Sequence, residues 1–266
     1  MIGFEIILFA LLFIGVYKYQ RNWKPVYPLF YTNGELIKIG HRGAPALAHE
    51  NTLASFTKAV ETGMNGVELD VQYSADKQLV VFHDWDLKTL NGSDKIIEKM
   101  PYSEIEKISL HDDDNNKIPL FREVLNVLSK KCIIVVEIKS VHFLNAGIEK
   151  NVLEIVKEFN FEENCIISSF NPLILWRIRK LNPNILTAFL WSKTDPQFSL
   201  NSPLWVWLCR PHAFHADIEH LDENLMSWIH RKKMSVLTFT VKTSSDLSKA
   251  KHLGVDGIIM DDPYLN

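Results

Sequence analysis

The sequence predicts a (β/α)8 barrel, the TIM-barrel architecture, and two observations support this fold class. Short apolar runs alternate with helical patterns along most of the chain, which indicates a parallel sheet covered by helices. Eight such runs in about 230 residues fit a closed barrel better than a doubly wound open sheet, which stays an alternative. The runs end near His41, Asp70, Lys139, Phe170, Leu190, Asp217, Val241 and Asp261.

Composition narrows the range of functions. The chain has 266 residues, is 47% hydrophobic and carries a formal net charge of −3. This size allows one large domain or two small ones, and the slight acidity offers no basic stripe for nucleic acid. The three cysteines, Cys132, Cys165 and Cys209, form no CxxC pair. We therefore expect reduced packing residues rather than a disulfide or zinc site. Nothing in the sequence predicts an oligomeric state.

The first 24 residues predict a transmembrane anchor. Residues 1–17 are apolar apart from Glu5, and Lys18, Arg21, Trp23 and Lys24 follow them. A helix of this length covers about 25 Å, just short of a typical hydrocarbon core. The position of the basic residues predicts a single-pass protein with its catalytic domain in the cytoplasm. A signal peptide, or a helix buried against the domain, is the weaker interpretation.

The remaining chain divides into a linker and the barrel. Residues 25–35 contain turn signals and predict a linker, and residues 36–266 form the predicted barrel. Asn51 or Thr52 can cap the first barrel helix, which continues to about residue 62 before Gly63.

A hairpin is expected early in the barrel. The turn at 75–78, between the apolar runs 67–73 and 79–82, is too short for a parallel crossover. The second run should therefore return antiparallel and bring His83 close to Asp70. The polar, irregular segment at about 84–118 then predicts an insertion.

After the insertion, apolar spacing predicts regular alternation of helices and strands. Helices are expected over 120–130, 144–159, 172–181, 222–232 and 244–252, and strands over 133–138, 165–169, 185–190, 213–217, 235–241 and 256–260.

Ionisable residues mark the ends of the first three predicted barrel strands. Glu68 and Asp70 are two residues apart and so point to one face, as do Glu137 and Lys139. Active sites of such barrels lie at the C-terminal strand ends. Because three carboxylates that converge there would repel one another, Glu68, Asp70 and Glu137 predict a site for a hard divalent cation, Mg²⁺ or Ca²⁺.

The other residues at these strand ends suit phosphoryl chemistry. Arg42 and Lys139 can neutralise a phosphate, Arg42 through a fork of hydrogen bonds. His41 and His83 can share the acid and base roles because the pKa of histidine lies near working pH. The sequence does not say which histidine is the acid. Asp84 could orient His83 or cap a turn, and both interpretations stay open.

Several sequence motifs together resemble the glycerophosphodiester phosphodiesterase family. In chain order they are HRG, ENT, ELD, VVFHD, EIK and GVDGIIMDDP, and the similarity covers about Ile39 to Pro263. The resemblance implies a barrel that hydrolyses glycerophosphodiesters to an alcohol and glycerol 3-phosphate with a divalent metal. It implies the same residue roles, with His41 and His83 as acid and base, Glu68, Asp70 and Glu137 as metal ligands, and Arg42 and Lys139 on the phosphate.

Departures from the family pattern affect substrate choice rather than reaction type. His49 replaces the usual proline before ENT, and the late strand has Phe239 and Lys242 where the family usually has tryptophan and asparagine. The arginine often found soon after the HD pair is absent. His215 and Asp217 also end a strand and could touch substrate, although a packing or rim role is favoured.

Other functions compete with this interpretation. A lysophospholipase D acting on membrane lysophospholipids is the nearest alternative, and an aromatic run at 204–208 could then enter the lipid interface. Phosphodiesterases of the phospholipase C or sphingomyelinase D type rank third. A catalytically silent lipid-binding protein is the alternative of another class, and the retained histidines and carboxylates argue against it.

Overall fold

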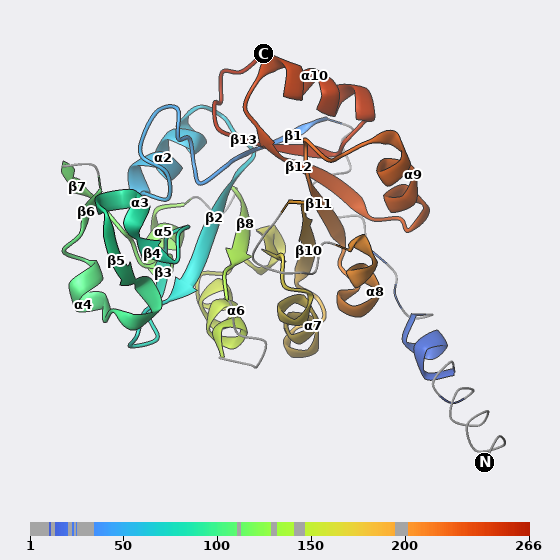
Figure 1. Cartoon of the computed structure of the whole chain (residues 1–266), viewed down its shortest axis with the longest axis horizontal. Helices are drawn as coiled ribbons and strands as arrows, with labels where there is room; N and C mark the ends of the chain where they lie inside the picture. Colours follow the sequence, from blue (N-terminus) through green and yellow to red (C-terminus); the bar gives the residue numbers. More distant parts are fainter. Residues whose placement is uncertain are drawn as a thin grey trace.

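A closed parallel barrel forms the centre of the molecule. The computed structural model describes residues 11, 14–20, 23, 25, 35–110, 113–128, 132–140, 147–194 and 202–266, with only the backbone described at 113–115. The barrel closes because β1 pairs in parallel with both β2 and β13 (Figure 1). Its strands are β1 (Ile37–Gly40), β2 (Gly66–Tyr73), β8 (Ile133–Ile138), β9 (Cys165–Ser169), β10 (Leu186–Trp191), β11 (Ala213–Asp217), β12 (Ser235–Val241) and β13 (Gly257–Met260).

The barrel prediction is therefore confirmed, and the open doubly wound sheet is excluded by the β1–β13 pairing. Helices surround the strands as the alternation predicted (Figure 1). They are α2 (Leu53–Glu61), α5 (Phe121–Val127), α6 (Ile148–Glu158), α7 (Pro172–Leu181), α8 (Val206–Cys209), α9 (Glu223–Arg231) and α10 (Ser244–Leu253).

Local sequence sets where these helices begin. The Thr52 side chain accepts a hydrogen bond from the Ser55 backbone amide and so caps α2. Asn171 caps α7 in the same way, and Pro172 occupies its first turn. A reciprocal capping box between Thr243 and Asp246 begins α10.

Strand alternation divides the side chains between two cores. Outward side chains such as Val67 and Leu69 of β2 pack under the helices. Inward side chains such as Ile39, Val135 and Leu237 fill the barrel. Because successive strand residues face opposite sides, Glu68 and Asp70 lie on the inner face of β2. Because Glu68 and Asp70 are two residues apart on β2, both carboxylates point into the barrel.

The predicted hairpin is present. Strand β3 (Leu79–Val81) pairs antiparallel with β2, with Val81 opposite Val71. The Phe82 amide donates to the Asp70 carbonyl at 3.1 Å, which extends the pairing to the residue before His83. The hairpin therefore returns His83 to the carboxylate end of β2.

The segment after the hairpin forms its own small layer beside β3 (Figure 1). Leu87, Ile97, Ile105, Leu110 and Ile118 build a separate apolar cluster there. Its elements are β4 (Asp86–Leu87), α3 (Lys88–Asn91), β5 (Ser93–Ile96), η2 (Ile97–Lys99), α4 (Tyr102–Ile105), β6 (Ser109–Leu110) and β7 (Asp113–Lys117).

The transmembrane prediction for residues 1–24 is wrong. Within the described part of the chain, no helix has the length and apolarity needed to cross a membrane. The predicted single-pass membrane localisation with a cytoplasmic barrel loses its basis with it. Most of the apolar run, residues 1–10 with 12 and 13, lies outside the described residues, as does 26–34 of the predicted linker.

Contacts at the end of this segment show why the basic and aromatic flank was misread. The Tyr19 hydroxyl donates to the Leu208 carbonyl at 2.7 Å, and the Trp23 indole donates to the Pro211 carbonyl at 3.2 Å. The Trp23 ring also contacts Trp207 edge-on at 5.9 Å. The polar aromatic residues that resembled a membrane boundary are thus bound to the barrel domain beside α8.

Candidate active site

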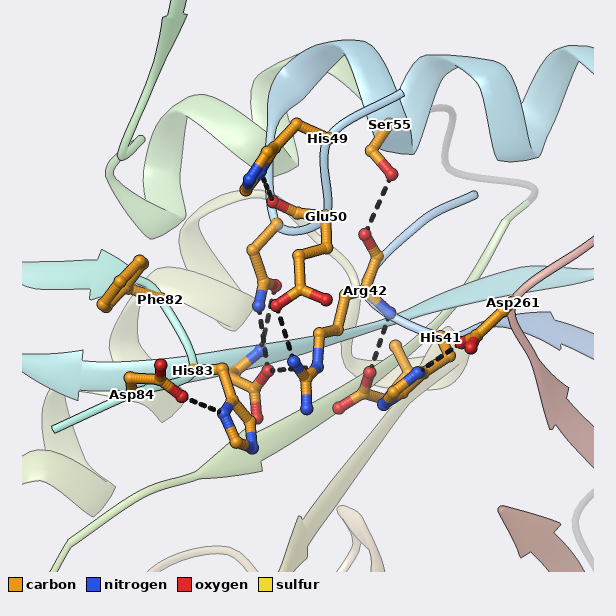
Figure 2. A network of polar contacts seen from close by, with 12 residues as sticks. His41, Arg42, His49, Glu50, Ser55, Phe82, His83, Asp84 and Asp261 are labelled. Carbon is orange, nitrogen blue, oxygen red and sulfur yellow. Dashed lines mark hydrogen bonds and ion pairs between the residues drawn. The ribbon is translucent and has the colours of Figure 1, made fainter. Parts of the chain in front are cut away.

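The C-terminal ends of β1, β2 and β8 are neighbours in the barrel. Gly40 pairs with Val67, and Asp70 pairs with Glu137. This register brings the predicted carboxylates and basic residues to one end of the barrel. Figure 2 shows Arg42 between His41 on one side and His83 on the other.

The three predicted metal ligands lie together. Ligand oxygens of Glu68, Asp70 and Glu137 all lie within 4.8 Å of one another. Glu68 and Asp70 are buried, and Glu137 is partly exposed. Burial, followed by the charges of Asp70 and Glu137, raises the pKa of the Glu68 carboxyl well above its ordinary value. Burial and repulsion by the neighbouring carboxylates therefore disfavour the charged form of Glu68.

Asp70 lies in the opposite electrostatic situation. Burial alone would raise its pKa, but Lys139 and Arg42 outweigh this effect and hold the pKa of Asp70 below its usual range. Lys139 Nζ and Arg42 Nε each lie 3.4 Å from an Asp70 oxygen. The Asn51 side-chain amide donates to Asp70 at 2.9 Å. Asp70 therefore stays ionised.

Lys139 and Arg42 keep their charges for the same reason. Burial would lower the pKa of Lys139, but Glu137, 3.0 Å away, and Asp70 raise it above its ordinary value. The pKa of Arg42 is raised likewise by Asp70 and Glu50 against its own burial. Both side chains therefore stay cationic at working pH.

A tight turn positions Arg42. Its backbone has a left-handed φ of 54°, and Gly43 follows with a φ of 95°. A Cβ on Gly43 would lie 2.3 Å from the Ser55 hydroxyl, so the turn requires glycine there. That hydroxyl donates to the Arg42 carbonyl at 3.0 Å (Figure 2). The turn thereby directs the Arg42 amide to Glu68 at 2.9 Å and its guanidinium to Glu50 at 2.6 Å.

In both His41 and His83, the Nδ1 atom of the ring lies within hydrogen-bond distance of an aspartate. His41 Nδ1 lies 2.6 Å from Asp261, and His83 Nδ1 lies 2.7 Å from Asp84 (Figure 2). A carboxylate at Nδ1 selects the tautomer that carries its proton there and leaves Nε2 for proton transfer. Of the two interpretations of Asp84, the structure supports the pairing with His83.

Gln72 fixes the second histidine. Its side-chain amide donates to the carbonyls of Phe82 and Asp84, both at 2.8 Å. Since Gln72 is buried on β2, these bonds hold the residues on either side of His83 against the barrel.

Sequence reasoning missed three residues of this cluster. Glu50 and Asn51 belong to the ENT motif, but Asn51 was considered only as a helix cap. Asp261 was noted only as a strand end. Closure of the barrel would have indicated it, because the last strand of a closed barrel lies beside the first, and Gly40 pairs with Met260.

Of the other residues singled out in the sequence, His49 and Lys242 border this cluster, whereas Asp217 and Phe239 have contacts of their own. His215 is completely buried. Asp217 accepts hydrogen bonds from Ser192 at 2.8 Å and from its own loop at Glu219. Phe239 contacts Phe170 edge-on at 6.0 Å, and Lys242 Nζ lies 3.9 Å from Asp261. His49 bonds to the Glu50 carbonyl beside the site (Figure 2).

Comparison with known proteins decides the family. Residues 41–265 match the model of the glycerophosphoryl diester phosphodiesterase family. The chain belongs to this family. It is 34% identical over 235 residues to a glycerophosphodiester phosphodiesterase of Caldanaerobacter subterraneus, covering 85% of this chain and 94% of the relative.

Solved structures of similar phosphodiesterases have the same fold as this chain. The enzyme of Thermotoga maritima has a TM-score of 0.71 at 31% identity, covering 86% of this chain and 96% of its own. A phosphodiesterase of Oleispira antarctica, solved with sn-glycerol-3-phosphate, has a TM-score of 0.73 at 26% identity, covering 85% and 93%. The predicted enzyme class, a glycerophosphodiester phosphodiesterase, is confirmed.

The carboxylate cluster fits a divalent cation. Its donors are oxygens, which Mg²⁺ and Ca²⁺ prefer, and they are close enough to share one ion. A cation would also relieve the repulsion that raises the pKa of Glu68. Both ions predicted from the sequence suit this donor set.

Replacing Glu68→Gln should stabilise the protein in EDTA at neutral pH. Because the pKa of Glu68 in the folded protein lies above its ordinary value of 4.5, protonation favours the folded state. That stability is present below pH 4.5 and lost as the pH rises through the folded value. The gain in Tm from the substitution should therefore shrink as the pH falls towards 4.5, with each kcal/mol of relief worth about 2–4 °C.

The exposed Glu61→Gln serves as the control, because Glu61 forms only a surface pair with Lys58. Added Mg²⁺ or Ca²⁺ should raise the Tm of the native enzyme more than that of the Glu68→Gln variant. A Tm for Glu68→Gln that is no higher than native throughout this pH range would contradict the assignment.

Proposed function

We propose that this enzyme hydrolyses glycerophosphodiesters to an alcohol and sn-glycerol 3-phosphate, with a divalent cation and a pair of histidines as acid and base. One observation carries the proposal. Two histidine–aspartate pairs, His41–Asp261 and His83–Asp84, flank an arginine that also contacts the carboxylate cluster.

Glu68, Asp70 and Glu137 would hold the cation, which as a Lewis acid would stabilise negative charge on the phosphoryl oxygens. Arg42 and Lys139 supply the remaining positive charge. Their ion pairs with Asp70 already orient both side chains to the same carboxylate. The phosphate of a diester carries a single negative charge, which this arrangement can receive without leaving a buried charge unpaired.

The histidines divide the proton transfers. One accepts a proton at Nε2 from the attacking O–H, either water or a hydroxyl of the substrate, as a new P–O bond forms. The other donates its Nε2 proton to the leaving oxygen as the P–O bond to the alcohol breaks. A cyclic phosphate formed by the substrate hydroxyl is then opened by water, which gives glycerol 3-phosphate. Asp261 and Asp84 stabilise whichever ring is cationic, and solvent returns both rings to their starting states.

The comparisons support the substrate class. The Caldanaerobacter relative is named a glycerophosphodiester phosphodiesterase, and the Oleispira structure contains sn-glycerol-3-phosphate. Both match this chain over about 85% of its length. A diester that contains glycerol 3-phosphate is thus the first substrate to test.

The purified chain should release glycerol 3-phosphate from glycerophosphocholine with Mg²⁺ or Ca²⁺, and EDTA should stop the reaction. Lysophosphatidylcholine is assayed in parallel, with lysophosphatidic acid as the product to be measured. Turnover of the lysophospholipid alone would favour the lysophospholipase D alternative. A folded protein that turns over neither substrate would contradict the proposal and favour the silent lipid-binding alternative.

Asp261→Asn should lower kcat by about 10²-fold or more while leaving the fold intact. An amide at His41 Nδ1 no longer selects the correct tautomer and no longer stabilises the imidazolium. The same Asp→Asn change lowers kcat by about 10⁴-fold in the Ser-His-Asp triad of serine proteases. Steady-state kinetics and the Tm of the purified variant measure the two effects.

Asp262→Asn is the matched control, because this neighbouring carboxylate accepts only the Tyr264 amide among its recorded hydrogen bonds. Asp84→Asn should act like Asp261→Asn, since it faces His83 in the same way. Equal kcat values for Asp261→Asn and Asp262→Asn would remove Asp261 from the mechanism.

A further inference from the structure

Ser168 and His215 lie buried on the inner face of the barrel without hydrogen-bond partners. Both residues are 0% exposed. Within the described residues, the Ser168 hydroxyl and both ring nitrogens of His215 have no partner. Buried polar groups are almost always paired with protein or with ordered water, so three unpaired groups on two residues need an explanation.

The register of the ladders places both residues in one layer. Ser168 pairs with Ala188, and Ala188 pairs with Ala213, two residues before His215. In an eight-stranded barrel, adjacent strands are staggered by about one residue, so each inner layer takes its side chains from alternate strands. Ser168 of β9 and His215 of β11 therefore fall in the same layer.

That layer also contains Glu68. Ser168 pairs with Glu137, and Glu137 pairs with Asp70, two residues after Glu68. From β9 to β2 the path crosses two strands, in the direction opposite to the path from β9 to β11. The stagger of one residue per strand therefore brings Glu68, two residues before Asp70, to the height of Ser168 and His215. These three polar side chains therefore share a layer with Ile259 of β13, above the apolar layer of Ile39 and Leu237.

The chemistry of these two side chains matches a water molecule. Burial lowers the pKa of His215 to about 3, so its ring is neutral at working pH, with one nitrogen that donates and one that accepts. A serine hydroxyl also donates and accepts. An internal water needs two to four polar partners, and the residues that the register places next to Ser168 and before His215 are the small Ala188 and Ala213.

We propose that Ser168 and His215 hold a buried water molecule that hydrogen-bonds Glu68 and fixes this carboxylate to receive the divalent cation. The inference rests on the cation site of the proposed function. The Arg42 amide holds Glu68 from the side of the β1 turn at 2.9 Å. The water holds it from within the barrel. Ser168 and His215 are then positioning residues that act through Glu68, in the way that residues behind metal ligands generally tune affinity.

Ser168→Ala should weaken binding of Mg²⁺ or Ca²⁺ by about 10-fold or more. The affinity is measured by calorimetry on the full chain without substrate, together with the Tm in EDTA. Ser235→Ala is the matched control, because Ser235 is another fully buried hydroxyl without a partner among the described residues. Ser235 begins β12, below the apolar layer, so its removal should leave the affinity unchanged.

His215 gives a second, independent test. His215→Phe keeps a ring but removes both nitrogens and should weaken the cation to a similar degree. His215→Gln or His215→Asn, which restore a polar atom, should recover part of that loss. If His215→Phe does not fold, Ser168→Ala and the crystal structure decide the question.

A high-resolution crystal structure should show a water within about 3.2 Å of the Ser168 hydroxyl and of one His215 nitrogen. No water there, or equal affinities for Ser168→Ala and Ser235→Ala, would overturn the inference while leaving the cation site intact. A native enzyme that binds neither cation would instead overturn the cation site itself, and the inference with it.

Discussion

The packing of three carboxylates against two cations at one barrel end is the constraint on which the site depends. Glu68 and Asp70 are on the same strand and the same face, yet their pKa values move in opposite directions. Asp70 has Lys139 and Arg42 within 3.4 Å, whereas Glu68 receives only a backbone amide of Arg42 among its recorded hydrogen bonds. Asp70 thus anchors the side chains of Lys139 and Arg42, and a bound ion would relieve the repulsion on Glu68.

The two histidine–aspartate pairs, the three clustered carboxylates and Lys139 occupy one continuous arc of the barrel. Strands β13, β1, β2 and β8 are consecutive neighbours and carry the histidine, carboxylate and lysine ends. On the remaining arc, the half-buried Phe170 ring follows β9, and the half-buried Phe239 and the buried Leu190 lie near the C-terminal ends of β12 and β10.

Most of the barrel was predictable because period-two alternation and short turns leave few choices. Residues 75–78 alone required the hairpin that brings His83 to Asp70, and the parity of Glu68 and Asp70 required both to face inward. Asp261 was missed because its partner, His41, is 220 residues away, and only the closing β1–β13 pair brings the two together. The spacing of residues in the sequence shows which side chains share one face of a strand. It does not show which strand lies next to that strand.

The prediction for the N-terminal segment was wrong, and the layer of Ser168 and His215 was not predicted, for a different reason. Hydropathy averages over a window and does not distinguish a ring that enters lipid from one that binds its own domain, as Trp23 does against Trp207 and the Pro211 carbonyl. In Ser168 and His215, the sequence shows polar residues inside apolar strands, but the decisive fact is that they have no protein partner within the described part of the chain.

The two histidine–aspartate pairs are built alike but supported differently. Asp84 follows His83 directly, and both depend on the β2–β3 hairpin and on Gln72. Asp261 reaches His41 only because the last strand closes the barrel beside the first. The His83–Asp84 pair is therefore a local feature of the chain, whereas the His41–Asp261 pair forms only when the whole barrel has closed. A chain with an open barrel would keep one oriented histidine and lose the other, so the orientation of both histidines requires the complete fold.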